Sequence, residues 1–222
     1  MTASPVHQAA QAVTAPRAGA VAGILFAALF GLSVVLIRLS VPANSADALA
    51  WTESTLNRAT FALRLIPFAG IFFLWFMGVV RDRLGASEDK FFATVILGSG
   101  LVFVALTFAS CAIAGALLDS LLTSGSQALP LGVYLFARSI TDVAFNTFAV
   151  KMTSVFMLSL GTLLRSTMVM PRSLSYLTYL LALVMLVALS RSLWLLLIFP
   201  AWVLVVSTFI LITNLHPKEA GR

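Results

Sequence analysis

The fold is decided by an uninterrupted apolar stretch between two arginines, residues 18–37, which reads AGAVAGILFAALFGLSVVLI. An α-helix rises about 1.5 Å per residue, so a helix from Arg17 to Arg38 covers roughly 31 Å. The hydrocarbon core of a bilayer is about 30 Å thick, and the stretch therefore predicts a membrane-crossing helix. A signal peptide cleaved near Ala43 is the alternative interpretation. A single preceding arginine and so long an apolar run are not typical of a signal peptide.

Five further apolar stretches follow the first one, and short polar segments separate them. The second ends at Val80, the third begins at Phe91, the fourth ends before Arg165, and the last two occupy 173–190 and 193–213. Each is long enough to cross a bilayer. The sequence therefore predicts an all-α fold, a polytopic membrane bundle of six transmembrane helices.

This bundle accounts for residues 18–214 and leaves no room for a separate soluble domain. Residues 1–17 carry little charge and show no periodicity, which predicts a disordered cytoplasmic tail. Residues 215–222 form a second cytoplasmic tail. Pro200 predicts a kink in the last helix, because a proline cannot donate a backbone hydrogen bond.

The composition limits the partners of the chain. Hydrophobic residues make up 60% of it and charged residues only 10%, with a formal net charge of +6. In a soluble protein this surplus would suggest nucleic acid, but here the basic residues lie mostly at the ends of the spans, where they meet lipid headgroups. We therefore expect the lipid bilayer, and not nucleic acid, as a partner. The excess of arginine over lysine and the abundance of alanine and valine favour a bacterial origin.

No cofactor or metal is expected. The single cysteine, Cys111, lies inside a span, and the two histidines, His7 and His216, lie in the tails. Metal and haem sites need several such ligands. The sequence also contains no H-E-x-x-H and no G-x-S-x-G motif, and no histidine lies within a span to activate a serine. We therefore expect a protein that is not an enzyme.

The distribution of positive charge predicts the orientation, because loops on the cytoplasmic side are richer in lysine and arginine. One side carries Arg17, Arg81, Arg83, Lys90, Arg165, Arg172, Lys218 and Arg222, and the other carries Arg38, Arg58 and Arg191. We therefore expect a multi-pass protein of the bacterial cytoplasmic (plasma) membrane, with both termini in the cytoplasm.

The three middle helices are longer than a membrane requires. Helical patterns over residues 47–81, 90–122 and 130–165 correspond to roughly 51, 48 and 52 Å. A core of about 30 Å leaves some 20 Å of each helix to be placed elsewhere. In the predicted orientation, all three helices extend beyond the outer surface.

Polar side chains are concentrated in these extensions. One stripe of the second helix contains Glu53, Asn57, Thr60 and Arg64. One stripe of the fourth helix contains Arg138, Asp142 and Asn146. Asp119 lies at a similar height on the third helix. We predict a polar cluster in which Glu53 pairs with Arg138, and Arg64 reaches toward Asp142 and Asn57. The cluster either ties the helix ends together or lines a vestibule for a polar solute.

Lys151 lies apart from this cluster. It follows Asp142 by nine residues, which places it on the opposite face of the fourth helix, roughly 21 Å from the inner surface. A lysine at this depth needs a partner or a path to water.

Small residues and aromatic residues are the remaining features of the spans. Gly19, Gly23, Ala27 and Gly31 form a small face on the first span, and Ala105, Ala109, Ala112 and Ala116 form one on the third. Such faces let helices approach closely, and we expect both to pack within the bundle. We expect Phe72, Phe73, Trp75, Phe76, Trp194 and Trp202 to face lipid or the interface.

Three functions remain open. The first, which the small-residue faces and the missing catalytic motifs favour, is a non-enzymatic accessory or scaffold subunit that packs against other membrane proteins or against itself. The second is a transporter or channel for a small polar or anionic solute, with an outer vestibule. The third is an enzyme that acts on lipid through Glu53, Asp119 and Asp142, which requires at least two of these carboxyl groups to meet.

Overall fold

The structure, a computed structural model, describes residues 5–41, 51–84, 90–124, 130–166, 170–187 and 193–215. Every regular element in these ranges is helical, as the sequence predicts. The elements are α1 (Pro5–Ser40), α2 (Glu53–Leu84), α3 (Lys90–Ser124), α4 (Leu131–Asp142), α5 (Val150–Ser166), α6 (Arg172–Val187) and α7 (Ile198–Leu215). A π-helical segment, η2 (Val143–Ala149), joins α4 to α5, and a 3₁₀ segment, η3 (Leu193–Leu197), leads into α7.

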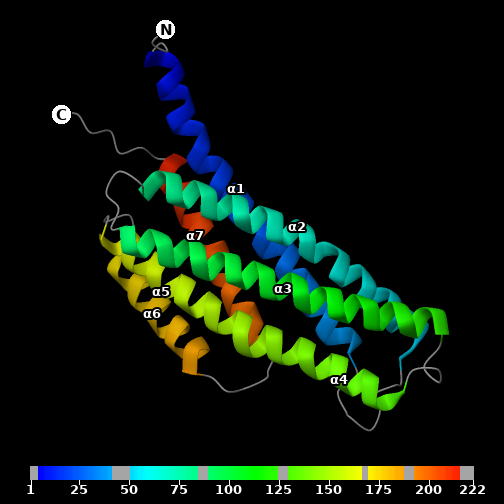
Figure 1. Cartoon of the computed structure of the whole chain (residues 1–222). Coiled ribbons are helices and arrows are strands. Elements are labelled where there is room, and N and C mark those ends of the chain that lie inside the picture. Colours follow the sequence, from blue (N-terminus) through cyan, green and yellow to red (C-terminus); the bar gives the residue numbers. More distant parts are fainter. Residues whose placement is uncertain are drawn as a thin grey trace.

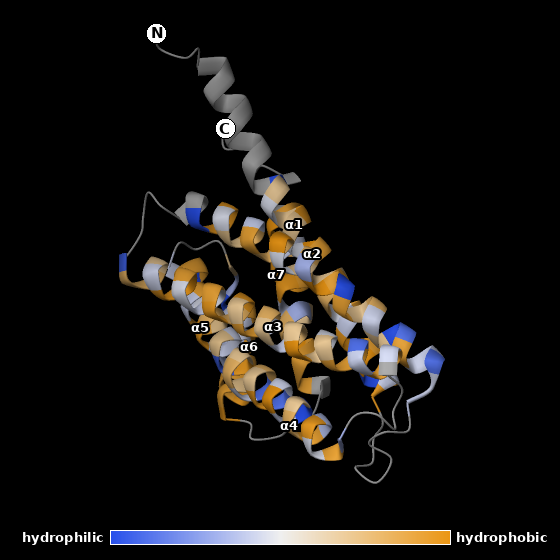
Figure 2. Cartoon of the chain, turned by 45° about the vertical axis from the view of Figure 1, so that its right-hand side comes forward, coloured by the Kyte–Doolittle hydropathy of each residue, from blue (hydrophilic) through white to orange (hydrophobic). Residues whose placement is uncertain are grey.

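The chain has the helices of a multi-pass membrane protein. Five helical stretches in the described ranges are long and apolar enough to cross a bilayer: 17–40, 53–81, 90–123, 131–166 and 195–212. The sixth, α6, has 16 residues, or roughly 24 Å of helix, which is less than the membrane core. Apolar residues follow the middles of the helices, and polar residues gather toward their ends and along α4 (Figure 2).

Several helix ends differ from the sequence predictions. Residues 5–17 belong to α1, although we predicted a disordered tail there; alanine and glutamine favour a helix, and Pro5 stands at its first position, where proline is tolerated. The helix α2 begins after Thr52, whose Oγ1 accepts a hydrogen bond of 3.3 Å from the backbone N–H of Thr55. Residues 42–50 and 216–222 lie outside the described ranges.

The helices pack side by side in an elongated bundle (Figure 1). Helix α1 packs along α2 and α7, α3 packs between α2 and α5, and α6 packs against α5. Helix α1 begins and α7 ends at the same end of the bundle. Pro200, where we predicted a kink, lies in the first turn of α7 directly after the 3₁₀ segment η3, so its missing N–H removes no bond from the interior of α7.

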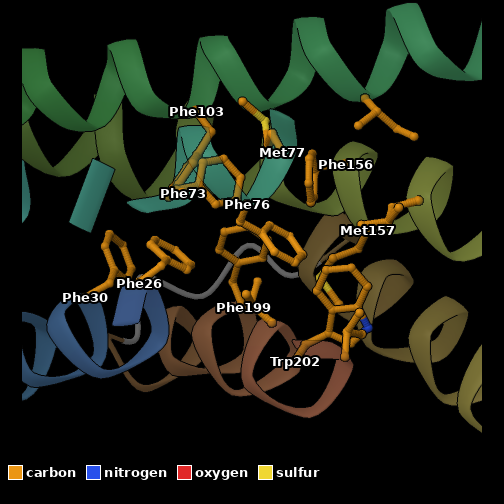
Figure 3. Close-up of a cluster of buried hydrophobic side chains, with 14 of the residues drawn as sticks. Phe26, Phe30, Phe73, Phe76, Met77, Phe103, Phe156, Met157, Phe199 and Trp202 are labelled. Atoms are coloured by element: carbon orange, nitrogen blue, oxygen red, sulfur yellow. The ribbon is translucent and has the colours of Figure 1, made fainter. Parts of the chain in front are cut away.

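The centre of the bundle is filled by aromatic rings (Figure 3). We call this the aromatic cluster: Phe26, Phe30, Phe73, Phe103, Phe156, Phe199 and Trp202, from α1, α2, α3, α5 and α7. The Phe73 ring lies 4.9 Å from Phe26, 5.3 Å from Phe103 and 5.6 Å from Phe199, measured between centroids.

The expectation that the large aromatic residues face lipid is therefore only partly correct. Trp75 is exposed, but Phe73 and Phe76 are fully buried. Trp202 is also buried, and its indole Nε1 donates a hydrogen bond of 2.8 Å to Thr178 Oγ1 on α6. Tilted and edge-on ring contacts of this kind stabilise a core beyond the area they bury.

The two small-residue faces have different surroundings. On α1, a Cβ added to Gly23 would lie 2.0 Å from Ser207 Oγ and 2.9 Å from Phe76, so this face packs within the bundle as predicted. On α3, the face with Ala105, Ala109, Ala112 and Ala116 is exposed. The expectation that this second face also packs within the bundle is wrong, because α3 uses the opposite side, with Phe103 and Thr107, to meet the core.

Candidate functional site

A cavity of about 400 Å³ lies between α1, α2, α3, α4 and η2, at the end of the bundle where α1 ends. Apolar side chains make up most of its wall, and its polar side chains are Arg38, Ser110, Cys111, Arg138, Thr141, Asp142 and Asn146. Cavities of 300–1,000 Å³ with apolar walls and a few placed polar groups are typical of small-molecule sites. This cavity is therefore the candidate functional site.

One face of the fourth long helix supplies much of the polar wall. Arg138, Asp142 and Asn146 follow at intervals of four residues, and all three are half-buried. The Nδ2 of Asn146 donates a hydrogen bond of 2.6 Å to Asp142 Oδ1. The sequence predicted this stripe, and the structure places all of it on the cavity.

The π-helical segment η2 begins directly after Asp142. The N–H of Val150 bonds to the carbonyl of Phe145, five residues back, which widens this turn compared with an α-helix. Phe145 and Asn146 lie in the widened turn, and both line the cavity. Segments of this kind often occur at functional sites, and no sequence pattern used above predicts one.

Arg38 lies at the end of α1 and contributes a second guanidinium to the wall. Its side chain is half-buried, and it makes no hydrogen bond or ion pair with any residue in the described ranges. The sequence predicted Arg38 as the flank of the first span and as a charge of the outer side, but not as part of the site. Its distance from Arg17, roughly 31 Å of helix, places it at the level of Asn146 and could have shown that it belongs to the site.

Two apolar clusters border the cavity. Toward the middle of the bundle, Val34, Ile66, Phe145 and Leu196 separate it from the aromatic cluster. On the other side lies a smaller group, which we call the rim cluster: Leu56, Ala59, Leu118, Leu121 and Tyr134, with Trp51, Leu63 and Leu117 packed against it.

The rim cluster also contains a long-range hydrogen bond. The indole Nε1 of Trp51 donates to Tyr134 Oη over 3.2 Å and so links the start of α2 to α4. Sequence reasoning did not predict either residue as part of the site. The signal in the sequence was an aromatic residue near the predicted start of a helix: Trp51 near the start of the second and Tyr134 near the start of the fourth.

The other members of the predicted polar cluster lie elsewhere. Glu53, Asn57, Arg64 and Asp119 are exposed, and none of them lines the cavity. Within the described ranges Glu53 makes no ion pair with Arg138, and Arg64 makes none with Asp142.

The polar side chains of α2 lie outside the cavity because of the way this helix is turned about its own axis. This helix buries Ala59, Ala62, Ile66 and Ala69, so its polar stripe, about half a turn away, points outward. The three carboxyl groups considered for lipid chemistry therefore do not meet, because Glu53 and Asp119 face away from Asp142. No group of three histidine, cysteine, aspartate or glutamate side chains able to hold a metal occurs in the described part of the chain.

Lys151 binds the end of α6. Its Nζ donates hydrogen bonds to the backbone carbonyls of Leu186 and Met185, the latter at 3.2 Å. The last carbonyls of a helix have no partner within the helix and carry partial negative charge. Lys151 therefore finds its partner in the last turn of α6.

This contact joins two groups at the same depth in the bundle. Lys151 precedes Arg165 by the same number of residues by which Leu186 follows Arg172, so both groups lie at one depth, roughly 21 Å from the Arg165 end. We predicted a span over 173–190; the described part of this helix runs from Arg172 to Val187, and residues 188–190 lie outside the described ranges.

Comparisons with known protein families, curated proteins and solved structures give no match for this chain.

Proposed function

We propose that this membrane protein binds a small anionic solute in the cavity and carries it across the bilayer, as a transporter without enzymatic activity. The cavity and its half-buried Arg38 are the observation that carries the proposal. Hydrogen bonds from a guanidinium to an anion are roughly twice as strong as neutral ones, and they strengthen where water is excluded.

The distribution of charge supports a cavity that faces outward. Arg17, Arg81, Arg83, Lys90, Arg165 and Arg172 belong to the end of the bundle opposite the cavity. In a bacterial cytoplasmic membrane, the positive-inside rule places that end and both termini in the cytoplasm. Helices α2, α3 and α4 then extend beyond the outer surface, and a solute reaches the cavity from outside.

The aromatic cluster supports a closed inner path in this conformation. Beyond the cavity, a gap of about 10 Å³ lies among Phe30, Phe103 and Phe199, and it shares Phe145 and Leu196 with the cavity wall. A gap of this size holds at most one water molecule. Passage of a solute therefore requires a conformational change that parts these rings, as alternating access does.

Uptake into liposomes tests the proposal. Purified protein is reconstituted and supplied with labelled carboxylates and phosphate, and wild type is compared with Arg38→Gln and with Arg58→Gln, an exposed arginine at similar height. A charge-assisted hydrogen bond contributes about 1.5–3 kcal/mol, so Arg38→Gln should lower the apparent affinity roughly 10- to 100-fold. Arg58→Gln should behave as wild type. Absence of uptake of every solute, or equal uptake by Arg38→Gln, would contradict the proposal.

A second candidate, an accessory or scaffold subunit, is favoured by the exposed alanine face of α3. Ala105, Ala109, Ala112 and Ala116 would let another transmembrane helix approach closely. Purification in mild detergent followed by mass spectrometry tests it, with Ala109→Leu as the variant that blocks the face. A reproducible partner that Ala109→Leu loses would favour this role, and a strictly monomeric protein would count against it.

A further inference from the structure

We infer that the solute is a single-chain amphiphile with one carboxylate, such as a medium-chain fatty acid. The inference rests on the proposed function, since it assigns a chemical class to the ligand of the same cavity. Three properties of the cavity carry it: its volume, the separation of its apolar and polar walls, and the sign of its charge.

The volume limits the size of the ligand. If each non-hydrogen atom takes the roughly 30 Å³ that a water molecule occupies, about 400 Å³ holds on the order of 13 such atoms. A medium-chain fatty acid matches this space, whereas a single inorganic ion leaves most of the cavity unfilled.

The wall divides into two parts. The part from α1, α2, α3 and η3 is largely apolar, with Ile37, Leu63, Ile66, Leu117 and Leu196, and its polar side chains are the small Ser110 and Cys111 of α3. The polar part comes from one face of α4 and η2 and from Arg38 at the end of α1. A fully polar solute would place its hydration shell against the apolar wall, whereas an amphiphile satisfies both parts.

The charge of the wall favours a monoanion. The charged residues among the described lining residues are Arg38, Arg138 and Asp142, which leaves one positive charge in excess. Asp142 already accepts a hydrogen bond from Asn146, while Arg38 makes no ion pair within the described ranges. The carboxylate therefore binds at Arg38, on the side away from Asp142.

The depths of Arg38 and Ile66 in the membrane agree with a carboxylate bound at Arg38. Arg38 lies roughly 31 Å from Arg17 along α1, at the edge of a hydrocarbon core of about 30 Å. Ile66 lies deeper, at roughly 22 Å from Arg81 along α2. A fatty acid bound with its carboxylate at Arg38 and its chain toward Ile66 has the orientation it takes in the outer leaflet of a bilayer.

The single cysteine provides the test. Cys111 lines the cavity and is the only cysteine of the chain, so the rate at which a neutral maleimide alkylates it reports on occupancy. The native full-length protein is placed in nanodiscs of a zwitterionic lipid, and decanoate is compared with decanol, acetate and inorganic phosphate. We expect saturating decanoate to slow alkylation at least tenfold, and the other three probes to change it less than twofold.

Matched variants separate binding from effects on the membrane. In Cys111→Ser/Ala116→Cys the reporter moves to the exposed face of the same helix, and decanoate should leave its alkylation unchanged. Arg38→Gln should lose protection of Cys111 by decanoate, and Arg58→Gln should keep it. The comparison of ligands on the wild type needs no variant, so the test survives a variant that does not fold.

Each outcome has one meaning. If acetate or phosphate protects Cys111 as well as decanoate does, the ligand is not an amphiphile, but the proposal of anion binding stands. Equal protection by decanol overturns the role of charge, and with it both proposals. Slow alkylation in anionic phospholipid nanodiscs without decanoate overturns the single-chain assignment in favour of a phospholipid. Absence of protection by every probe overturns the proposed function as well as this inference.

Discussion

The aromatic cluster and the cavity lie next to each other in one bundle and are built in opposite ways. In the aromatic cluster, phenylalanines from five helices fill the space between the backbones (Figure 3). In the cavity, aliphatic and charged side chains line most of the wall, with Trp51, Tyr134 and Phe145, and about 400 Å³ stays open. In lipid, helix association depends on packing and hydrogen bonds, because lipid chains are as apolar as leucine. An unfilled space there costs stability, which favours a functional interpretation of the cavity.

The largest expected effect is loss of packing in the aromatic cluster. Phe73→Ala removes a fully buried ring that contacts Phe26, Phe103 and Phe199. A buried phenylalanine replaced by alanine typically lowers the free energy of unfolding by about 3–5 kcal/mol. Reversible denaturation in mixed micelles measures this change. Trp75→Ala, at an exposed position of the same helix, is the control and should change it by about 0.5 kcal/mol or less.

A somewhat smaller effect is expected where α1 meets α2 and α7. Gly23→Ala would place a methyl group 2.0 Å from Ser207 Oγ and 2.9 Å from Phe76, so the Ser207 hydroxyl must rotate and the Phe76 ring must move. Overpacking of this kind costs about 1–3 kcal/mol. Gly31→Ala, on the same helix with open space around it, should be neutral or stabilise by up to about 1 kcal/mol. If both variants have the same stability, the tight face of α1 is not where the structure places it.

Lys151 marks a third kind of environment, a charge held by backbone carbonyls between helices. Lys151→Met leaves the carbonyls of Met185 and Leu186 without this donor, and removal of the charge from the membrane offsets part of the loss. We expect a net decrease in stability of about 1–2 kcal/mol, the range measured for interhelical hydrogen bonds in model membrane peptides.

Hydrogen exchange distinguishes this role from a role in transport. Lys151→Met should increase exchange of amides in the last turn of α6, and Lys151→Arg should restore protection there. A variant that loses solute uptake but keeps the end of α6 protected would instead place Lys151 on the solute path.

The sequence predicted those properties that depend on the membrane. Apolar stretches such as 18–37 identified the helices, and the extent of the long helices over 90–124 and 131–166 agreed with prediction to within two residues. These features follow from the thickness of the bilayer and from helical periodicity, which one chain shows by itself.

The orientation of each helix about its own axis was less predictable. The stripe with Arg138 lines the cavity, but the equally regular stripe with Glu53 faces outward. In a soluble protein the apolar face identifies the inside, but a helix in lipid is apolar all round, so this signal is absent. The small residues Ala59, Ala62 and Ala69 of α2 were the better guide, because they mark the face that packs closely.

The variant with the smallest expected effect on stability tests most directly whether the cavity is open while the aromatic cluster is tightly packed. Ala114→Leu adds a larger side chain to the cavity wall, in space that is already open, so the free energy of unfolding should change by about 0.5 kcal/mol or less. The same substitution reduces the volume left for a ligand, and protection of Cys111 by decanoate should fall at least tenfold. Ala116→Leu, on the exposed face of α3, should leave both properties unchanged. A large loss of stability in Ala114→Leu would mean that this part of the bundle is packed as tightly as the aromatic cluster, and that the cavity is not available to a solute.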